Sequence, residues 1–266
     1  MSRVAPALVD AHVHFDDPRL DVDRDAAWHR ARAAGVLQMV VPAVAAASFA
    51  RTRAVCLRWP NLYPCYGLHP YFTQRHADAD LDTLDRWLAR GDAVAVGECG
   101  LDFFLDRLAG PALRQRQLAL FEAQLALAQR HDLPLVIHAR KSLDEITARL
   151  RRGGPGRGML HSFGGSLQQA HKLIDLGYHI SFCASITQPR AQRLWRIAAA
   201  LPADALLIES DAPDQPGAAH RGARNEPAWL GEVLESLAAA RGDSAAALAA
   251  ATSGNARRLF GLPSVG

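Results

Sequence analysis

The stretch Leu8-Val9-Asp10-Ala11-His12-Val13-His14-Phe15 has the pattern of a short strand that carries two histidines near its end. Because strand side chains alternate between the two faces of a sheet, we expect His12 and His14 to point the same way, with Asp10 one pleat behind them. Two neighbouring imidazoles can ligate one divalent ion. Such a pair also occurs at ordinary hydrogen-bonded strand ends, so it indicates a metal site only if the chain supplies further ligands.

Strand-like and helix-like patterns alternate along the whole chain, without a linker or a break in composition. Strands are expected over residues 8–15, 36–41, 62–68, 93–96, 135–138, 159–161, 178–182 and 206–211. Helices are expected over residues 24–34, 45–58, 81–89, 111–130, 142–151, 166–176 and 189–201, with further helices up to 255–260. Such alternation predicts parallel strands joined by right-handed crossovers.

Eight such units in 266 residues predict a single domain, residues 1–266, with the (β/α)8 TIM-barrel fold. A doubly wound open sheet is the alternative. That fold more often carries a glycine-rich fingerprint after its first strand, and this chain has His-x-His there.

The overall composition is that of an ordinary globular protein, with 49% hydrophobic and 21% charged residues. No apolar run of 18 residues predicts a membrane span, and no signal-peptide pattern precedes the first strand, so we expect a cytoplasmic protein. The four cysteines form no Cys-x-x-Cys pair, which favours reduced, buried thiols. A net charge of +3 is too small to indicate nucleic-acid binding by itself.

Residues that can ligate metals end five of the eight expected strands. They are His12, His14, Glu98, His138, His161 and Asp211. The carboxyl ends of barrel strands form one rim, where active sites are built. Each residue alone is explained equally well by hydrogen bonding or by a turn, but six together at five strand ends are not.

Four histidines and two carboxylates exceed what one four-coordinate ion needs, and they fit two ions that share a bridging carboxylate. Glu98 is best placed to bridge, because its strand lies roughly opposite the His-x-His strand. Two ions ~3.5–4 Å apart would hold a hydroxide and polarise the scissile oxygen. Asp211 could ligate one ion and take the proton of the attacking water.

At this point several motifs, in this order, resemble those of the TatD-type metal-dependent hydrolases of the amidohydrolase superfamily, and most closely its YjjV branch. The motifs are His12-Val13-His14, Gly67-Leu68-His69-Pro70, Gly97-Glu98-Cys99-Gly100-Leu101-Asp102, His138-Ala139-Arg140, His161-Ser162-Phe163-Gly164-Gly165, Glu209-Ser210-Asp211-Ala212-Pro213 and Asn255-Ala256-Arg257-Arg258-Leu259-Phe260. The resemblance implies a TIM barrel with two divalent ions. It places one ion on His12, His14 and Asp211, the other on His138 and His161, and makes Glu98 the bridge. It also implies deoxyribonuclease activity, notably 3′→5′ exonuclease action on single strands.

The chain departs from the family pattern at four positions within or beside these motifs. Cys99 stands where an aliphatic residue is usual, and a small buried thiol should be tolerated there. Phe103-Phe104 replaces the Tyr-His that often follows Gly-Leu-Asp in nuclease-type members, so the substrate is inferred less directly than the metal chemistry. Ser162 follows His161 where Cys or Gly is common.

Four residues are candidate substrate contacts. Arg140, two residues after His138, could clamp a phosphate with two hydrogen bonds or form a surface salt bridge. Arg221 and Arg224 lie in the loop after the last strand, where barrels often bind phosphate. His69, followed by Tyr71 and Phe72, could stack on a base or sugar or could pack the barrel mouth.

The leading hypothesis is a two-metal phosphodiesterase acting on the ends of single-stranded DNA. A small-molecule hydrolase (of a phosphomonoester, lactone or cyclic amide) is the first alternative, and a non-catalytic metal- or nucleotide-binding barrel is the second. Mixed carboxylate and imidazole sites suit Zn²⁺, Mn²⁺ or Ni²⁺, and Mg²⁺ fits them less well. We expect a DNA or small phosphorylated partner, no membrane contact and no obligatory protein partner.

Overall fold

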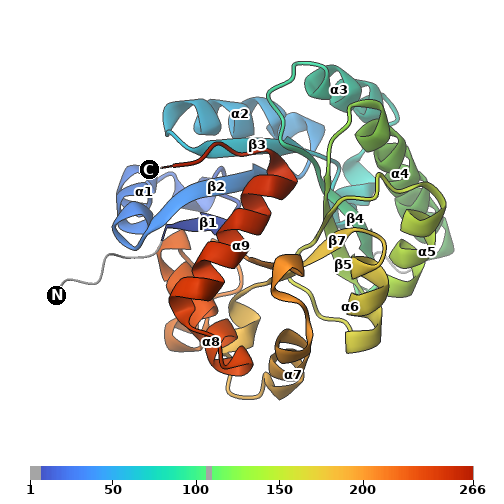
Figure 1. The fold of residues 1–266 in the computed structure, drawn as a ribbon. Helices are drawn as coiled ribbons and strands as arrows, with labels where there is room; N and C mark the ends of the chain where they lie inside the picture. The colour runs from blue at the N-terminus through green and yellow to red at the C-terminus, as the bar shows by residue number, and fades with distance from the viewer. Residues whose placement is uncertain (1–6, 106–109, 266) are drawn as a thin grey trace.

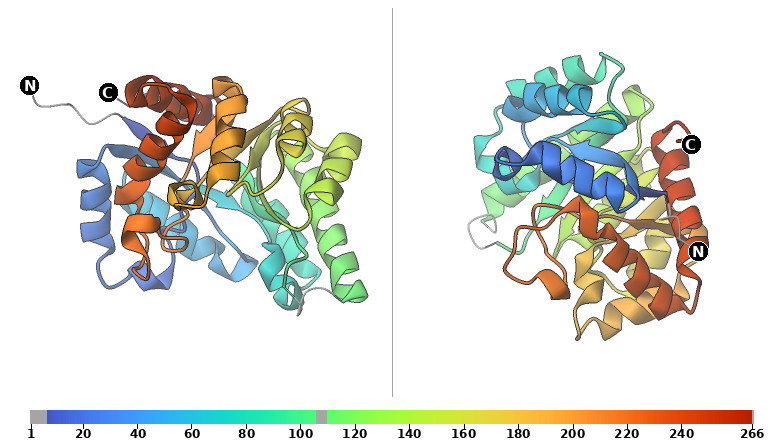
Figure 2. Two further views of the ribbon diagram at one scale, coloured as in Figure 1. Left: turned by 90° about the horizontal axis from the view of Figure 1, so that it is seen from below. Right: turned by 90° about the vertical axis from the view of Figure 1, so that its left-hand side faces the viewer.

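The computed structural model describes residues 7–105 and 110–265, so residues 1–6, which bear on the expected absence of a signal peptide, lie outside the described part. Within that part, eight parallel strands form one sheet in which each strand pairs with the next along the chain. Figures 1 and 2 show the strands curving into a nearly closed barrel with helices outside. The strands are β1 (Leu8–Asp10), β2 (Val36–Pro42), β3 (Leu62–Tyr66), β4 (Ala95–Asp102), β5 (Leu135–Arg140), β6 (Gly158–Leu160), β7 (Tyr178–Phe182) and β8 (Leu206–Ile208). The predicted (β/α)8 TIM barrel is confirmed.

The helices follow the strands in the predicted order. They are α1 (Arg24–Ala33), α2 (Phe49–Arg58), α3 (Ala79–Leu88), α4 (Pro111–Arg130), α5 (Leu143–Gly153), α6 (Leu167–Ile174), α7 (Gln192–Ala200), α8 (Leu230–Arg241) and α9 (Ala245–Phe260). Short 3-10 helices are η1 (Pro18–Leu20), η2 (Ala46–Ser48), η3 (Pro70–Arg75), η5 (Ala184–Thr187), η6 (Ala203–Ala205), η7 (Ala218–His220) and η8 (Pro227–Trp229). Local signals explain two helix starts: Pro111 opens α4, and the Ser166 hydroxyl accepts from the Gln169 N–H to cap α6.

Several strand ends differ from the sequence prediction, and three of them bear on the site. β1 ends at Asp10, because the next residues bond to other partners: the Val13 N–H donates to Val40 and the His14 N–H to Ala212. β4 continues to Asp102, so Glu98 lies inside the strand rather than after it. β8 ends at Ile208, three residues before Asp211.

The first and last strands are joined by hydrogen bonds just beyond β1 and β8. The Ala11 N–H donates to the Ile208 carbonyl at 3.1 Å. The fully buried Asp10 carboxylate accepts from the Ser210 hydroxyl at 2.5 Å and from the Ser210 N–H at 2.9 Å. These contacts bring the His-x-His segment next to the loop that carries Asp211.

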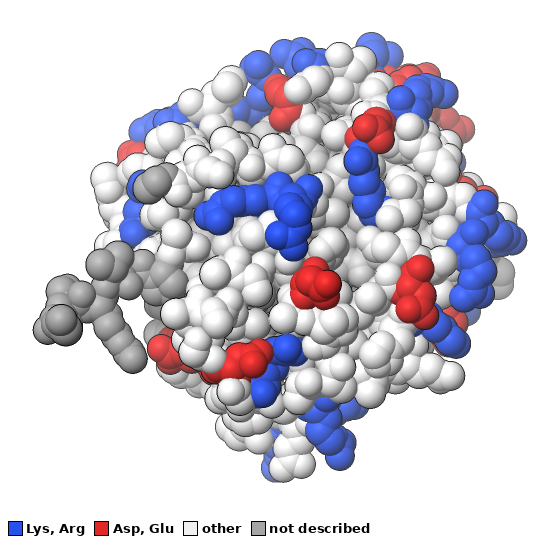
Figure 3. Space-filling view, in the orientation of Figure 1, with Lys and Arg blue, Asp and Glu red and all other residues white. Residues whose placement is uncertain are grey.

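The amino-terminal end of the barrel is closed by α9, which crosses it diagonally (Figure 1). Ala256, Phe260 and Leu262 pack against a second core inside the barrel, formed by inward residues such as Val9 and Leu207. Because α9 covers the amino-terminal end, the carboxyl end of the barrel is the open end. On the face that shows α9, basic and acidic side chains are interspersed (Figure 3). Among the described helices, none is long and apolar enough to cross a membrane.

Candidate metal centre

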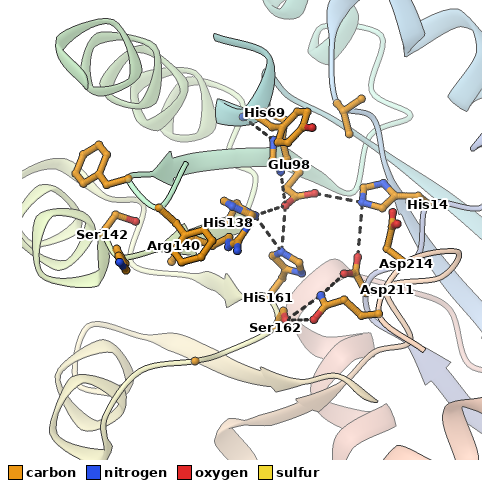
Figure 4. A pocket seen from close by; sticks show the side chains of 18 of the residues that line it. His14, His69, Glu98, His138, Arg140, Ser142, His161, Ser162, Asp211 and Asp214 are labelled. Atoms are coloured by element: carbon orange, nitrogen blue, oxygen red, sulfur yellow. Dashed lines mark hydrogen bonds and ion pairs between the residues drawn. The ribbon is translucent and has the colours of Figure 1, made fainter. Parts of the chain in front are cut away.

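The six ligand-type residues predicted from the sequence lie together at the carboxyl end of the barrel. Figure 4 shows His14, Glu98, His138, His161 and Asp211 pointing toward one another from different segments of the chain, and all five line one cavity. Glu98 is the central residue: its side chain is 1% exposed, and its two carboxylate oxygens face two different sets of ligand atoms. The cluster thus has two halves that share one carboxylate.

The first half consists of His12, His14, Asp211 and one oxygen of Glu98. His12 Nε2 lies 3.3 Å from His14 Nε2, 3.3 Å from Glu98 Oε2 and 3.4 Å from Asp211 Oδ1. His14 Nε2 lies 3.5 Å from Glu98 Oε2 and 3.6 Å from Asp211 Oδ1. Four ligands about 2.1 Å from one ion in a tetrahedron are separated by about 3.4 Å. The five distances match that spacing.

The second half consists of His138, His161 and the other oxygen of Glu98. His138 Nδ1 and His161 Nε2 each lie 3.1 Å from Glu98 Oε1, and the two nitrogens are 3.3 Å apart. These three atoms form one face of a similar tetrahedron. A cation held there would have three protein ligands and one open position, which is the arrangement of catalytic sites.

Hydrogen bonds on the far side of three histidine rings fix which nitrogen faces the cluster. His14 Nδ1 lies 3.3 Å from the Pro42 carbonyl, and because a carbonyl only accepts, Nδ1 carries the proton. His138 Nε2 lies 3.3 Å from Asp102 Oδ2, and His161 Nδ1 lies 3.2 Å from Glu209 Oε1. In the neutral form, each of the three rings therefore directs a lone pair at the carboxylates.

This arrangement of lone pairs is unfavourable unless a positive charge lies between them. Glu98 Oε2 is buried and accepts no hydrogen bond from any described residue, although two imidazole nitrogens face it. Either protons or metal ions can supply the charge. The donor set, mixed imidazole and carboxylate, is one that Zn²⁺, Mn²⁺ and related ions use, so the residues present fit a metal centre.

The pKa values show the same demand for positive charge. Burial alone would raise the pKa of Glu98 and Asp211, but the surrounding histidines outweigh burial and hold both pKa values well below the usual range. Burial and the neighbouring His161 disfavour a charged His12, yet Glu98 and Asp211 raise its pKa to about 9. The carboxylates are thus ionised and ready to bind cations.

His69 supports Glu98 from outside the cluster. Its Nδ1 accepts from the Tyr71 N–H at 2.9 Å, so Nε2 carries the proton and donates to Glu98 Oε1 at 2.9 Å. Burial is the main reason that the pKa of His69 is lowered to about 4, and the ring is neutral at pH 7. His69 therefore orients the central carboxylate and has no free nitrogen for a metal ion. Support of this kind is closer to packing at the barrel mouth, one of the two roles expected for His69, and stacking on a substrate stays a prediction.

Asp211 is positioned by its backbone and by Gln215. Its φ of +56° is in the left-handed region, its N–H donates to the His12 carbonyl, and the Gln215 amide donates to Asp211 Oδ2. Ser162, Lys141 and Gln215 also have positive φ and line the same cavity. Strained backbone of this kind gathers at functional sites, where the surrounding structure enforces it.

The cluster opens into a cavity of about 1550 Å³. Arg140 lines it, with its Nη1 3.8 Å from Asp102 Oδ2 and its side chain 46% exposed. Arg221 and Arg224 do not line it. Arg221 donates to Gln188, and Arg224 forms ion pairs with Asp23 and Glu226. The geometry therefore supports the predicted substrate role of Arg140 and does not support such a role for Arg221 or Arg224.

Three residues that hold the ligand side chains in place were not predicted as site residues from the sequence. Asp102 and Glu209 hold the outer nitrogens of His138 and His161, and Gln215 holds Asp211. Asp102 and Glu209 stand inside quoted motifs, at the ends of strand-like runs, and both are buried. A buried carboxylate next to a ligand-type residue was the available signal.

Comparison with known proteins agrees with this geometry. The model of the family described as TatD related DNase matches residues 9–261. The chain is 40% identical over 259 residues to the uncharacterized metal-dependent hydrolase YjjV of Escherichia coli, covering 96% of this chain and 98% of that one. It is 32% identical over 265 residues to the 3′-5′ ssDNA/RNA exonuclease TatD of Klebsiella pneumoniae, covering 96% and 98%.

Solved structures lead to the same group. The crystal structure of YjjV from Escherichia coli superposes with a TM-score of 0.93 at 39% identity, covering 98% of this chain and 100% of that one. A hydrolase of the TatD family from Entamoeba histolytica, 18% identical, shares the fold with a TM-score of 0.85 over 97% and 99% of the two chains. From the family match and these identities, we conclude that the chain belongs to the TatD family of metal-dependent hydrolases.

Proposed function

We propose that this protein is a two-metal phosphodiesterase that removes nucleotides from the 3′ end of single-stranded DNA. The observation that carries the proposal is the division of Glu98 between two sets of ligand atoms, one complete with four atoms and one with three. The four-atom position would hold its cation more tightly, and the three-atom position would leave room for a substrate oxygen.

Each residue of the centre has a distinct part in this reaction. Divalent ions supply a Lewis acid for the phosphoryl oxygen and lower the pKa of the attacking water. His12, His14 and Asp211 would hold one ion, His138 and His161 the other, and Glu98 both. Asp211 is ionised, and its carboxylate accepts the proton that the water loses. Gln215 keeps that carboxylate in place.

Two further observations favour a nucleic-acid end over a small molecule. The cavity, about 1550 Å³, exceeds the roughly 300–1,000 Å³ that drug-sized ligands occupy. Its wall also carries Arg140, whose guanidinium is suited to a phosphate. The name of the Klebsiella relative supports the same substrate and polarity.

An end-labelled oligonucleotide assay tests the proposal. Metal-stripped protein is incubated with single-stranded DNA labelled at either end, with and without added Mn²⁺, Mg²⁺, Zn²⁺ or Ni²⁺. We expect metal-dependent shortening from the 3′ end, and no shortening by Asp211→Asn prepared in parallel. Absence of cleavage with every metal would refute the nuclease function. Phosphate monoesters and lactones, tested with the same two proteins, would then decide whether the centre hydrolyses a small molecule.

A further inference from the structure

Phe104 is an exposed aromatic ring at the cavity that contains the metal centre. It lies two residues after the end of β4, lines the cavity and is 47% exposed. About half of this side chain is open to the cavity, where an aromatic ring can stack on a planar ligand.

Two cations lie against this ring. The Arg140 Cζ is 4.2 Å and the Lys141 Nζ 5.0 Å from the ring centroid. Apart from the 3.8 Å contact of Arg140 with Asp102, no ion pair of either cation is found among the described residues. Of the other cations on the cavity wall, Arg19 and Arg51 pair with carboxylates, Arg193 donates to backbone carbonyls, and Arg114 lies over Phe103. Arg140 and Lys141 are the positive charges that lie beside the Phe104 ring.

A single carboxylate connects the ring to the metal centre. Asp102 Oδ1 accepts from the Phe104 N–H at 2.9 Å, while Asp102 Oδ2 faces His138 Nε2 at 3.3 Å. Asp102 is fully buried, and Gln117 brackets its backbone through two further hydrogen bonds. The backbone of Phe104 is thus held by the same carboxylate that orients His138.

We propose that Phe104, Arg140 and Lys141 form a nucleotide subsite beside the metal centre. Phe104 stacks on one base of the bound strand, and the two cations contact the phosphate attached to it. A charge-assisted hydrogen bond to phosphate is stronger than an exposed cation–π contact, so the cations can leave the ring when a phosphate binds. The inference rests on the proposed function and adds to it which nucleotide unit the chain recognises.

Binding measured without turnover tests the subsite. Asp211→Asn protein, with Mn²⁺ present, is titrated with single-stranded 12-mers in which one abasic site is moved step by step from the 3′ end. We expect one position near that end to weaken binding roughly 5- to 150-fold, the range for loss of one stacked base. In that background, Phe104→Leu should bind the intact strand as weakly as the abasic one. Phe104→Tyr, which keeps the ring, should restore the difference.

The salt dependence of DNA binding tests the two cations separately from the ring. Arg140→Gln and Lys141→Gln should each make the plot of log affinity against log salt concentration less steep, by the contribution of about one phosphate contact. Phe104→Leu should leave this slope unchanged. Thermal unfolding confirms that every variant is folded. If Phe104→Leu keeps the full abasic effect, or neither cation changes the slope, the subsite is refuted although the strand still binds. If wild-type protein does not cleave DNA and Asp211→Asn protein does not bind it, the proposed function fails, and the subsite fails with it.

Discussion

Asp102→Asn should disable one half of the metal centre by moving the ring proton of His138 from Nε2 to Nδ1. Asp102 Oδ1 accepts from the Phe104 backbone N–H, which can only donate, so the oxygen of an asparagine must stay on that side. Its amide NH₂ then faces His138 Nε2, where the wild-type carboxylate accepts. His138 can accept this hydrogen bond only by moving its own proton to Nδ1, the atom that faces Glu98 at 3.1 Å. That proton removes the lone pair a cation needs.

The expected loss of metal affinity follows from the two hydrogen-bonding arrangements that are open to the asparagine variant. If the proton moves, the position formed by His138 and His161 loses a ligand. If the amide turns round instead, the Phe104 N–H loses its acceptor in a partly buried position, which costs about 1–3 kcal/mol. Since 1.4 kcal/mol is a factor of ten, either route predicts roughly 10- to 100-fold weaker binding of one metal ion, the usual range for losing such a supporting group.

Glu209→Gln is the matched control, because the same chemical change should be tolerated there. Glu209 Oε1 accepts from both His161 Nδ1 and the Ser162 N–H, so the glutamine oxygen stays at that position. The NH₂ group then faces the Ser181 hydroxyl, which donates to Oε2 in the wild type and can rotate to accept. His161 keeps its tautomer, and metal affinity should change by less than about 10-fold.

Calorimetric titration of metal-stripped proteins with Zn²⁺ or Mn²⁺ measures both variants. Wild type and Glu209→Gln should bind two ions, and Asp102→Asn should bind one ion with unchanged affinity and the second much more weakly. Glu209→Ala, which removes the acceptor altogether, should resemble Asp102→Asn. The reasoning is wrong if Asp102→Asn binds two ions as tightly as wild type, or if Glu209→Gln loses more affinity than Asp102→Asn.

Three further predictions concern stability, positioning and charge. Chelation should lower the melting temperature by roughly 5–10 °C, because metal at 100 times its Kd contributes about 2.7 kcal/mol, and calorimetry before and after re-addition of metal checks this. Gln215→Ala frees Asp211 Oδ2 and should weaken metal binding at the Asp211 position about 10-fold; an unchanged titration curve would contradict the role given to Gln215. Arg224→Ala should leave KM unchanged and raise the pKa of Asp23, which Arg224 and Arg30 hold at about 2. Because the pKa of Asp23 is lower in the folded protein than in the unfolded chain, where it is near 4, the ion pair stabilises the fold above about pH 4 and loses this effect as the pH falls towards 2. The difference in stability between wild type and Arg224→Ala should therefore disappear over that pH interval, which NMR titration and denaturation can follow. A large rise in KM would instead place Arg224 at the substrate.

The sequence was sufficient for the barrel and for the set of ligand-type residues. Alternation of apolar runs with helical patterns is a local property, and eight repeats of it leave few topologies. Parallel strands bring their carboxyl ends to one rim whatever their separation along the chain. Residues as distant in sequence as His12 and Asp211 could therefore be assigned to one site from the sequence, and His12 Nε2 and Asp211 Oδ1 lie 3.4 Å apart.

Only the tertiary structure decided how those residues are held and which charges reach the cavity. The tautomer of His138 depends on Asp102, and that of His161 on Glu209, because a ring proton follows whichever acceptor the neighbouring strand presents. Arg140 and Arg224 look alike in sequence, yet one lines the cavity and the other pairs with Asp23. Hydrogen bonds and ion pairs between distant segments depend on distances of a few tenths of an ångström, and no local pattern of residues encodes them.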